Sequence, residues 1–525
     1  MKKYKLIIII ISIVGIMTSC GEDYLALFPS GDFAAGAPAT RDVIEQNLVS
    51  AYQLMLFDAY ANGQWMPVNM FFDICTDDIY IGGGDANDQP YAQATAEFRT
   101  NPVTMPDGWW RIFFTGLRRC NGVLEAIENA VDVQPDVLAR LKAETLTLRA
   151  YYTHWLWKAY GNIPYFDQAW VQEPFLARQH SFDEMYPIIL ADLNEAINTP
   201  EFPMTATGTQ RGRITKAMAM MTKARVVMYY KDQTKYAEVL ADMKTIIGNS
   251  AYSLVMNATT PNSGSNTTNP VEWIFLREGQ FSSESIFEVN HHPSISDWTA
   301  GRGFGHYTPR FIGARAIGAP HDALYQSGWG FGNVQPAAYA IFEEDDYRKE
   351  ASVIEFPDSY SGGGYQWTGL VLKKYIARIG YNTGTTGDAS HRWENNKRIY
   401  RVAEAYLNIA ELELAAGGGQ AAAQPYLDAV RLRAFGVPNV IPATLNNIKL
   451  ERRREFFGEG LRFWDLVRWG SCENDVAIGT LLTVTDLNVP ISRTWNDNKK
   501  FQPIPQGEID RTKDTQFELV QNPGY

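Results

Sequence analysis

Between residues 42 and 248, apolar and polar positions alternate with the spacing of amphipathic helices. Apolar side chains recur three and four positions apart, which places them on one face of a helix. This pattern predicts helices at residues 41–56, 109–131, 135–161, 181–197, 214–232 and 235–248. The fourth helix has a defined start, because Ser181 precedes Glu184 by three positions, as in a capping box.

Alanines seven residues apart recur in three of the predicted helices. The pairs are Ala143 with Ala150, Ala217 with Ala224, and Ala403 with Ala410. Each of these helices precedes another that contains a tyrosine, at Tyr186, Tyr236 or Tyr426. Small residues two turns apart let a second helix approach closely, and repeated helix pairs are typical of tetratricopeptide-like stacking. The alternative is that alanines reach this spacing by chance, as they do in any helical bundle.

The helical pattern stops between Ser250 and Lys397 and resumes at residues 396–418 and 421–436. Glycine clusters, a polar low-complexity stretch and isolated aromatic residues take its place, at residues 301–305, 328–332, 361–365 and 257–270. We therefore predict a mostly α-helical, tetratricopeptide-like superhelix with a large loop-rich insertion. Long loops on a rigid frame concentrate binding residues, so we expect the ligand site in the insertion and in the loop at residues 63–105.

The N-terminus has the pattern of an export signal. Three lysines precede an apolar run at residues 6–17, which is shorter than the roughly 20 residues that a membrane-spanning helix needs. The small residues before Cys20 resemble the cleavage box of bacterial lipoproteins, in which the cysteine becomes the first residue and carries acyl chains. Glu22 and Asp23 resemble the signal that sends lipoproteins of the Bacteroidetes to the outer face of the outer membrane. The alternative is a plain secretory signal with an incidental cysteine.

Four segments follow from these patterns. They are a signal peptide at 1–19, helical regions at 20–250 and 398–525, and the insertion at 251–397, with 20–525 forming one compact unit. Removing residues 1–19, which contain three lysines and no acidic residue, changes the net charge from -12 to -15. A chain with this net negative charge lacks the basic surface that nucleic-acid binding needs.

The remaining cysteines and the histidines do not form the pattern of a disulfide framework or a metal site. Cys75, Cys120 and Cys472 are too few and too scattered for a disulfide framework, so we expect buried free thiols. The alternative is a single disulfide between two of them. His291 and His292 form the one histidine pair, and we interpret them as part of a surface turn rather than a metal site. We predict no metal and no cofactor.

A charged segment at residues 451–468 predicts an ion-pair network. Its acids and arginines, at residues 451–455 and at Arg462, Asp465 and Arg468, flank a break at Gly458 and Gly460. Arginine pairs carboxylates through two parallel hydrogen bonds, so these residues could fasten two helices together. Carboxylates already paired with arginine are poor candidates for proton transfer, which argues against a catalytic role.

Residues 451–470 resemble the C-terminal signature of the SusD/RagB family of outer-membrane nutrient-binding lipoproteins. Further segments agree with this family in the same order, at residues 21–31, 148–166, 400–418, 429–438 and 501–509. The resemblance spans essentially the whole chain after the signal peptide. It implies a carbohydrate-binding lipoprotein of the outer membrane that faces the cell exterior. It also implies that the protein sits on a SusC-like, TonB-dependent transporter and passes glycan fragments to it.

Sugar sites combine flat aromatic rings with carboxylates, amides and arginines. The loops offer such residues, and we select as glycan-binding candidates Trp65, Asp77, Asp78, Tyr80, Trp298, Tyr307, Trp329 and Asn333. Tryptophans inside helical periodicity are assigned to packing instead: Trp110, Trp155, Trp157, Trp464 and Trp469.

Two other functions remain open from the sequence. A surface-anchored glycoside hydrolase needs two carboxyl groups about 5 to 9.5 Å apart, which no sequence pattern can reveal. A peptide-binding or adhesive surface protein would use the helix pairs to bind protein partners. The sequence contains no nucleophile elbow, metal motif or phosphate loop, and we therefore predict that the protein is not an enzyme.

Overall fold

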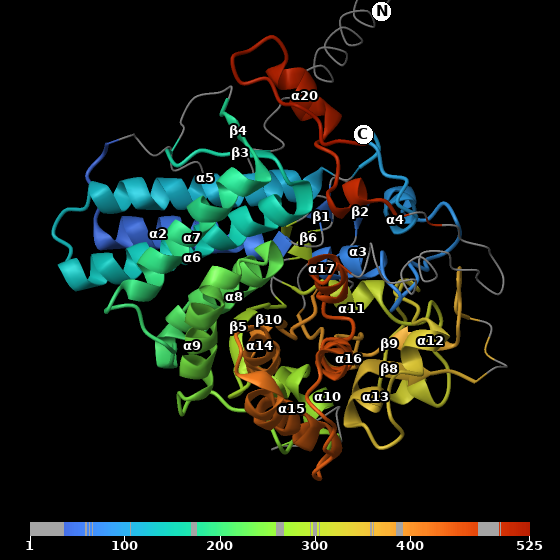
Figure 1. The fold of residues 1–525 in the computed structure, drawn as a ribbon. Helices are drawn as coiled ribbons and strands as arrows, with labels where there is room; N and C mark the ends of the chain where they lie inside the picture. The colour runs from blue at the N-terminus through green and yellow to red at the C-terminus, as the bar shows by residue number, and fades with distance from the viewer. Residues whose placement is uncertain are drawn as a thin grey trace, which may run out of the picture.

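A computed structural model gives the fold of the chain (Figure 1). It describes residues 36–57, 60–61, 64–65, 67–105, 107–169, 176–258, 267–293, 296–297, 302–303, 305–357, 360, 362–384, 392–470, 493 and 495–525. Cys20, Trp298 and Cys472 lie outside the described residues, and of Trp65 only the backbone is described.

Helix pairs that follow one another along the chain form the frame. The pairs are α6 (Pro135–Tyr160) with α7 (Phe182–Asn198), α8 (Lys216–Tyr230) with α9 (Tyr236–Ile247), and α14 (Val402–Ala415) with α15 (Gly419–Phe435). These are the pairs predicted from the alanine spacing, and all six alanines are at most 1% exposed. Helix α14 packs directly on α9 across the insertion, so the pairs continue as one tetratricopeptide-like stack.

Local signals fix the ends of these helices. The predicted capping box is confirmed at α7, where the backbone N–H of Glu184 donates to Ser181 Oγ at 3.2 Å and the N–H of Ser181 donates to Glu184 Oε2 at 2.8 Å. Further helices extend the frame at both ends of the stack: α2 (Arg41–Tyr52), α5 (Gly108–Glu128), α16 (Leu445–Glu455) and α17 (Arg462–Arg468).

The helix predicted at residues 396–418 begins later than expected. Residues Lys397–Arg401 form the strand β10, which pairs antiparallel with β5 (Ser285–Val289), and α14 starts only at Val402. Arg398 lies opposite Glu288 in this pairing. The prediction was wrong here because the partner strand is more than 100 residues away in the sequence, where a local pattern cannot reveal it.

The insertion contains short elements between long loops, as predicted. They are α10 (Pro270–Ile274), η5 (Arg277–Gly279), β6 (Ser296–Asp297) with β7 (Arg302–Gly303), α11 (Thr308–Phe311), η6 (His321–Ala323), α12 (Pro336–Tyr339), α13 (Tyr347–Ser352) and β8 (Val353–Glu355) with β9 (Leu370–Leu372).

Similar short elements connect the helices elsewhere. They are η2 (Gln53–Phe57), β1 (Tyr60–Ala61) with β2 (Gln64–Trp65), α3 (Val68–Asp73), α4 (Pro90–Ala96), β3 (Ile163–Pro164) with β4 (Gln179–His180), η3 (Gly208–Gln210), η4 (Gln233–Lys235), η8 (Asp497–Lys500) and α20 (Gln506–Thr512).

One hydrophobic cluster extends from Ala39 to Leu519 and takes residues from the insertion as well as from both helical regions. The boundaries at residues 250 and 397 stay a prediction.

The tryptophans assigned to packing are buried, except that Trp469 is only partly buried and donates its indole N–H to Glu411. Cys75 and Cys120 are buried free thiols, as expected.

His291 differs from the expected surface turn. It is buried and stacks on His306, with ring centroids 4.7 Å apart, whereas His292 is exposed. Within the described residues, every helix is too short or too polar to cross a bilayer.

Candidate functional site

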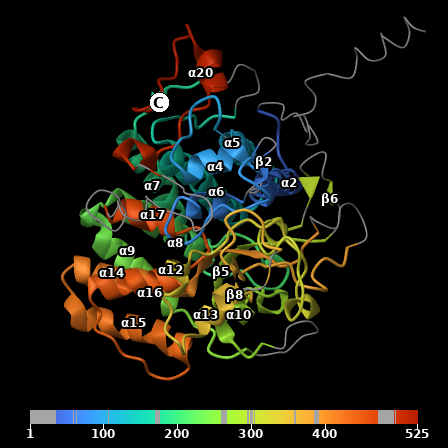
Figure 2. The same cartoon turned by 90° about the vertical axis from the view of Figure 1, so that its right-hand side faces the viewer.

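The two loop regions expected to carry the ligand site lie side by side. The N–H of Tyr80 donates to the carbonyl of Asn333, that of Gly332 to Ile81, and that of Gly83 to Gly330, each at 2.8 Å. A third segment joins them, because the N–H of Tyr365 donates to the carbonyl of Gly83 at 2.9 Å. We call residues 79–84, 328–335 and 362–371 the loop layer. Figures 1 and 2 show the yellow insertion against the blue N-terminal loops.

Glycine allows the three backbones to touch. Gly82 has a φ of +76°, and a Cβ atom there would lie 2.1 Å from the carbonyl oxygen of Gly330. Gly364 has a φ of +101°, and its Cβ would lie 2.5 Å from the carbonyl oxygen of Gly83. Other residues rarely adopt these angles and would clash with the neighbouring backbone. The glycine clusters in the sequence therefore build the loop layer.

Asp77 and Asp78 hold the loop layer to the C-terminal helices through ion pairs with arginines. Asp77 Oδ2 lies 2.6 Å from Arg453 Nη2, and Asp77 Oδ1 lies 3.0 Å from Arg462 Nε. Asp78 Oδ1 accepts a hydrogen bond from Arg453 Nε at 2.7 Å. Both acids are at most 2% exposed. A buried carboxylate needs a charged partner, and these two have arginines, while their expected role in binding sugar hydroxyls stays a prediction.

The two neighbouring acids respond differently to burial. For Asp77, burial alone would raise the pKa, but the attraction of Arg462 and Arg453 outweighs it and lowers the pKa below the usual value. For Asp78, burial raises the pKa even though Arg453 opposes it. Asp77 also contacts two arginines, whereas Asp78 contacts one.

Three further candidates are also buried. Tyr80, Tyr307 and Asn333 are 7%, 4% and 0% exposed. Asn333 Nδ2 donates to the carbonyl of Tyr365 at 3.0 Å, which fastens two parts of the loop layer to each other. Tyr80 and Asn333 belong to the loop layer, and Tyr307 directly precedes α11. Contact of these three residues with a glycan stays a prediction. The sequence alone does not distinguish an amide that binds backbone, as Asn333 does here, from one that binds sugar.

Trp329 is the described candidate that reaches the surface. It is partly exposed, and its ring packs edge-on against Phe311 with centroids 5.0 Å apart. Arg315 Nη1 donates to the backbone carbonyl of Trp329 at 2.9 Å, and the Arg315 side chain is 44% exposed. Asp88 Oδ2 lies 3.7 Å from the same Arg315 nitrogen.

Two partly exposed aromatic residues that the sequence analysis missed lie in the same region. The rings of Tyr360 and Trp367 are 5.4 Å apart, and both pack against Phe356. The N–H of Ala316 donates to Gly362 at 3.3 Å, which brings their loop beside Arg315. We call Trp329, Tyr360 and Trp367 the aromatic patch. Tyr360 and Trp367 flank the glycine cluster at 361–365, and this signal could have identified them.

The aromatic patch has the chemistry of a sugar-binding surface. Its rings offer flat apolar faces for the C–H groups of a sugar, and Arg315 and Asp88 offer hydrogen bonds for hydroxyl groups at its edge. The loop layer beneath holds these side chains in place through backbone hydrogen bonds. No group of three or more histidine, cysteine or acidic side chains suited to a metal ion occurs among the described residues.

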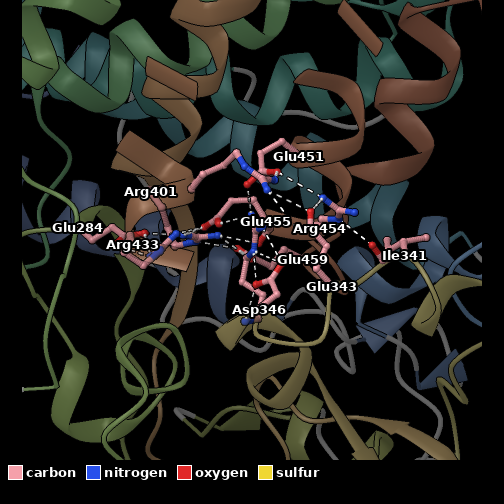
Figure 3. Close-up of polar contacts among 12 residues, drawn as sticks. Glu284, Ile341, Glu343, Asp346, Arg401, Arg433, Glu451, Arg454, Glu455 and Glu459 are labelled. Carbon is pink, nitrogen blue, oxygen red and sulfur yellow. Dashed lines mark hydrogen bonds and ion pairs between the residues drawn. The ribbon is translucent and has the colours of Figure 1, made fainter. Parts of the chain in front are cut away.

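A buried ion-pair cluster joins the insertion to the C-terminal helices (Figure 3). Its members are at most 2% exposed and are Glu284, Asp346, Arg348, Arg401, Arg431, Arg433, Glu451 and Glu455. Arg401 Nη1 lies 2.6 Å from Glu284 and 3.0 Å from Glu455. Arg348 lies 2.7 Å from both Asp346 and Glu451.

The predicted C-terminal network is therefore larger than expected. Arg452 does pair with Asp465 at 2.7 Å and so joins α16 to α17, as predicted. The other charges on α16 reach distant segments instead: Glu451 and Glu455 bind arginines of the ion-pair cluster, and Arg454 binds Glu343 at 2.8 Å. Helix α16 is thus the common anchor of the frame, the insertion and the loop layer.

This arrangement predicts a loss of stability in acid. Burial alone would raise the pKa of Glu455, but Arg433, Arg401 and Arg348 together hold it below the usual value. Buried acids of lowered pKa (Asp77, Glu272, Glu404, Glu455 and Asp465) outnumber those of raised pKa (Asp73, Asp78 and Asp192) among the described residues. An acid of lowered pKa stabilises the fold above its unfolded pKa, and this contribution disappears as pH falls.

We therefore expect the urea midpoint to be highest above about pH 5 and to fall progressively below about pH 4.5. Urea titrations at constant ionic strength between pH 7 and pH 3 measure this change. A midpoint that stays constant down to pH 3.5 would contradict the role assigned to the arginine-paired acids.

Comparisons with known proteins identify the family of the chain. Residues 37–228 match the family described as "Starch-binding associating with outer membrane", and residues 348–525 match the SusD family. The chain is 23% identical over 439 residues to SusD-like protein P25 from Formosa agariphila, covering 78% of this chain and 77% of that protein.

Two solved structures are more similar. The surface glycan-binding protein A from Bacteroides fluxus is 41% identical with a TM-score of 0.85, covering 93% of this chain and 100% of that one. The surface glycan-binding protein A from Bacteroides thetaiotaomicron, in complex with laminarihexaose, is 33% identical with a TM-score of 0.82, covering 92% and 100%. With its family matches, its helix-pair fold and this similarity over nearly its whole length, the chain belongs to the SusD family.

Proposed function

We propose that the chain is a surface lipoprotein that captures oligosaccharides or polysaccharide on the aromatic patch and delivers them to a SusC-like, TonB-dependent transporter. The observation that carries this proposal is the aromatic patch itself, which places three partly exposed rings beside Arg315 on a rigid loop layer. Similarity to two surface glycan-binding proteins supports it. Trp65 and Trp298 remain predicted contributors to the same site.

The proposed ligand class is a glucan of the laminarin type. Support comes from the similar protein of Bacteroides thetaiotaomicron, whose structure is in complex with laminarihexaose. Stacking rings recognise the apolar face of a glucose unit, and the charged groups at the edge of the patch orient its hydroxyls.

Calorimetric titration with laminarihexaose, maltohexaose and cellohexaose tests both the function and the ligand class. We expect heat of binding with laminarihexaose and weaker or no binding with the other two. The same mixtures, assayed for new reducing ends, should show none, since the protein binds without cleaving. Release of reducing ends would favour the glycoside hydrolase, and binding of peptides but of no glycan would favour the peptide-binding alternative.

The lipid anchor is proposed at Cys20, because acyl chains on one cysteine can hold a large domain on a bilayer. A Cys20→Ala variant should leave the outer-membrane fraction and lose labelling by a palmitate analogue. Cys472→Ala is the matched control and should keep both the label and the membrane location. An unlabelled wild-type protein would overturn the anchor without affecting the glycan site.

Delivery to a transporter is tested by purification from the native outer membrane. An affinity-tagged chain should co-purify with a large TonB-dependent barrel, and a variant lacking the ring of Trp329 should still do so, because a barrel contacts a broad surface. Isolation of the folded protein without any barrel would contradict the delivery step.

A further inference from the structure

A small cavity lies where α6, α8, α14, α16 and α17 meet. Its volume is about 40 Å³, and charged side chains from all five helices line it: Lys158, Arg225, Glu404, Arg452, Asp465 and Arg468. None of the aromatic patch residues is among its lining residues. The glycan-binding function therefore leaves this cavity unexplained.

The arginines and carboxylates around the cavity are matched to each other. Arg225 binds Glu404 through two hydrogen bonds of 2.8 and 2.7 Å. Asp465 accepts from Arg452 at 2.7 Å and from Arg468 at 2.8 Å. Arg468 also donates to Glu411 at 2.8 Å. Three arginines thus balance three carboxylates, which leaves the charge of Lys158 without compensation.

Lys158 is a buried cation without an anionic partner in the described part of the chain. The residue is 5% exposed, and its Nζ lies 3.5 Å from the centre of the Trp155 ring and 4.5 Å from that of Trp464. Among the described residues, no carboxylate lies within 4.0 Å of this nitrogen, which contacts the rings of Trp155 and Trp464 instead. A buried charge is costly unless it is paired, and two aromatic faces offset only part of that cost.

His154 provides a second, independent sign that the cavity is occupied. It lines the cavity and is 1% exposed, and its Nε2 has no hydrogen-bond partner among the described residues. Its Nδ1 is hydrogen-bonded to the carbonyl of Tyr151 and therefore carries the proton, which makes Nε2 an acceptor. Buried polar atoms without protein partners are usually satisfied by an ordered water or ion.

We propose that this cavity binds a small monovalent anion, chloride or one of similar size, against Lys158 Nζ, together with a water that donates a hydrogen bond to His154 Nε2. A cavity of this volume holds roughly two or three water-sized particles, which fits one such anion and one or two waters. The anion supplies a negative charge for Lys158, because the nearby carboxylates are already paired with arginines.

The position of the cavity gives the anion a structural consequence. Arg452 lines the cavity, and the next residue, Arg453, binds Asp77 and Asp78 beneath the loop layer. Burial lowers the pKa of Lys158 well below its usual value, so an empty cavity favours the uncharged amine, and a bound anion favours the ammonium. A higher chloride concentration outside the cell would therefore stabilise the helices that hold the binding loops.

Bromide provides the direct test, because it replaces chloride and scatters anomalously. Crystals of the wild-type protein soaked in sodium bromide should show an anomalous peak within about 3.5 Å of Lys158 Nζ. A peak absent from this cavity, or a cavity filled by waters alone in well-ordered crystals, would overturn the proposal.

Thermal unfolding gives a second readout in solution. Chloride should raise the melting temperature of the wild-type mature protein by about 2 °C or more over gluconate at equal ionic strength. Lys158→Met should abolish this difference. Lys142→Met is the matched control, since Lys142 lies on the same helix but is 48% exposed and pairs with Glu195, and it should keep the full chloride effect. An equal chloride effect in a folded Lys158→Met protein would overturn the proposal, and the bromide test remains decisive if this variant does not fold.

Discussion

Arg401→Met should lower the free energy of unfolding by about 3 to 5 kcal/mol, because it removes one of the cations that several buried carboxylates share and leaves an excess of buried negative charge. Arg401 pairs with Glu284 and Glu455, which are fully buried, and donates to Glu459 at 2.7 and 2.9 Å. Methionine fills a similar volume but carries no charge. The loss should appear in urea titrations as a lower midpoint with an unchanged slope.

Arg178→Met is the control for this prediction. Arg178 also pairs with a glutamate, Glu184, at 3.0 Å, but both side chains are about half exposed. An exposed pair contributes about 0 to 1 kcal/mol, so this variant should unfold nearly like the wild type. Equal stabilities for the two variants would mean that the ion-pair cluster does not hold the insertion to the frame.

The double variant Trp329→Ala with Trp367→Ala should lose at least tenfold in glycan affinity while remaining folded. Each stacked ring contributes on the order of 1 kcal/mol or more, by analogy with aromatic pairs, and 1.4 kcal/mol corresponds to a factor of ten. Both rings are partly exposed, so their removal opens no closed cavity in the core. Calorimetric titration measures the affinity, and near-ultraviolet circular dichroism verifies the fold.

Trp155→Ala provides the contrast. Trp155 is 7% exposed and stacks on Phe113 with centroids 5.8 Å apart, so its removal should destabilise the fold by roughly 3 to 5 kcal/mol. Its glycan affinity per folded molecule should stay unchanged. Unchanged affinity in the folded double variant would instead show that the aromatic patch is not the binding site.

The helix pairs were predictable because each depends on a pattern within one stretch of sequence. Ala143 and Ala150 lie on one helical face, and the neighbouring helix that covers them follows directly in the chain. Strand β10 was not predictable, since its residues pair with β5 across a long loop. Local periodicity identifies a segment that packs on its neighbour in sequence, but not one that needs a distant partner.

The candidate site was predicted less well, for the same physical reason. Asp77 and Asp78 stand in a loop with aromatic neighbours, as sugar-binding acids do, but their partner Arg453 is 375 residues away from Asp78. A carboxylate that binds arginine and one that binds a hydroxyl group look the same in a sequence. Trp329 stands between glycines in a loop and is partly exposed, and its contact with a glycan stays a prediction.

The central claim is that a glycan stacks on the aromatic patch, and a crystal structure of the protein with its glycan, laminarihexaose first, tests it most directly. We predict that sugar rings will contact Trp329, Tyr360 or Trp367, with Arg315 or Asp88 hydrogen-bonded to hydroxyl groups. A glycan bound on another face of the molecule, with these three rings uncovered, would contradict the account.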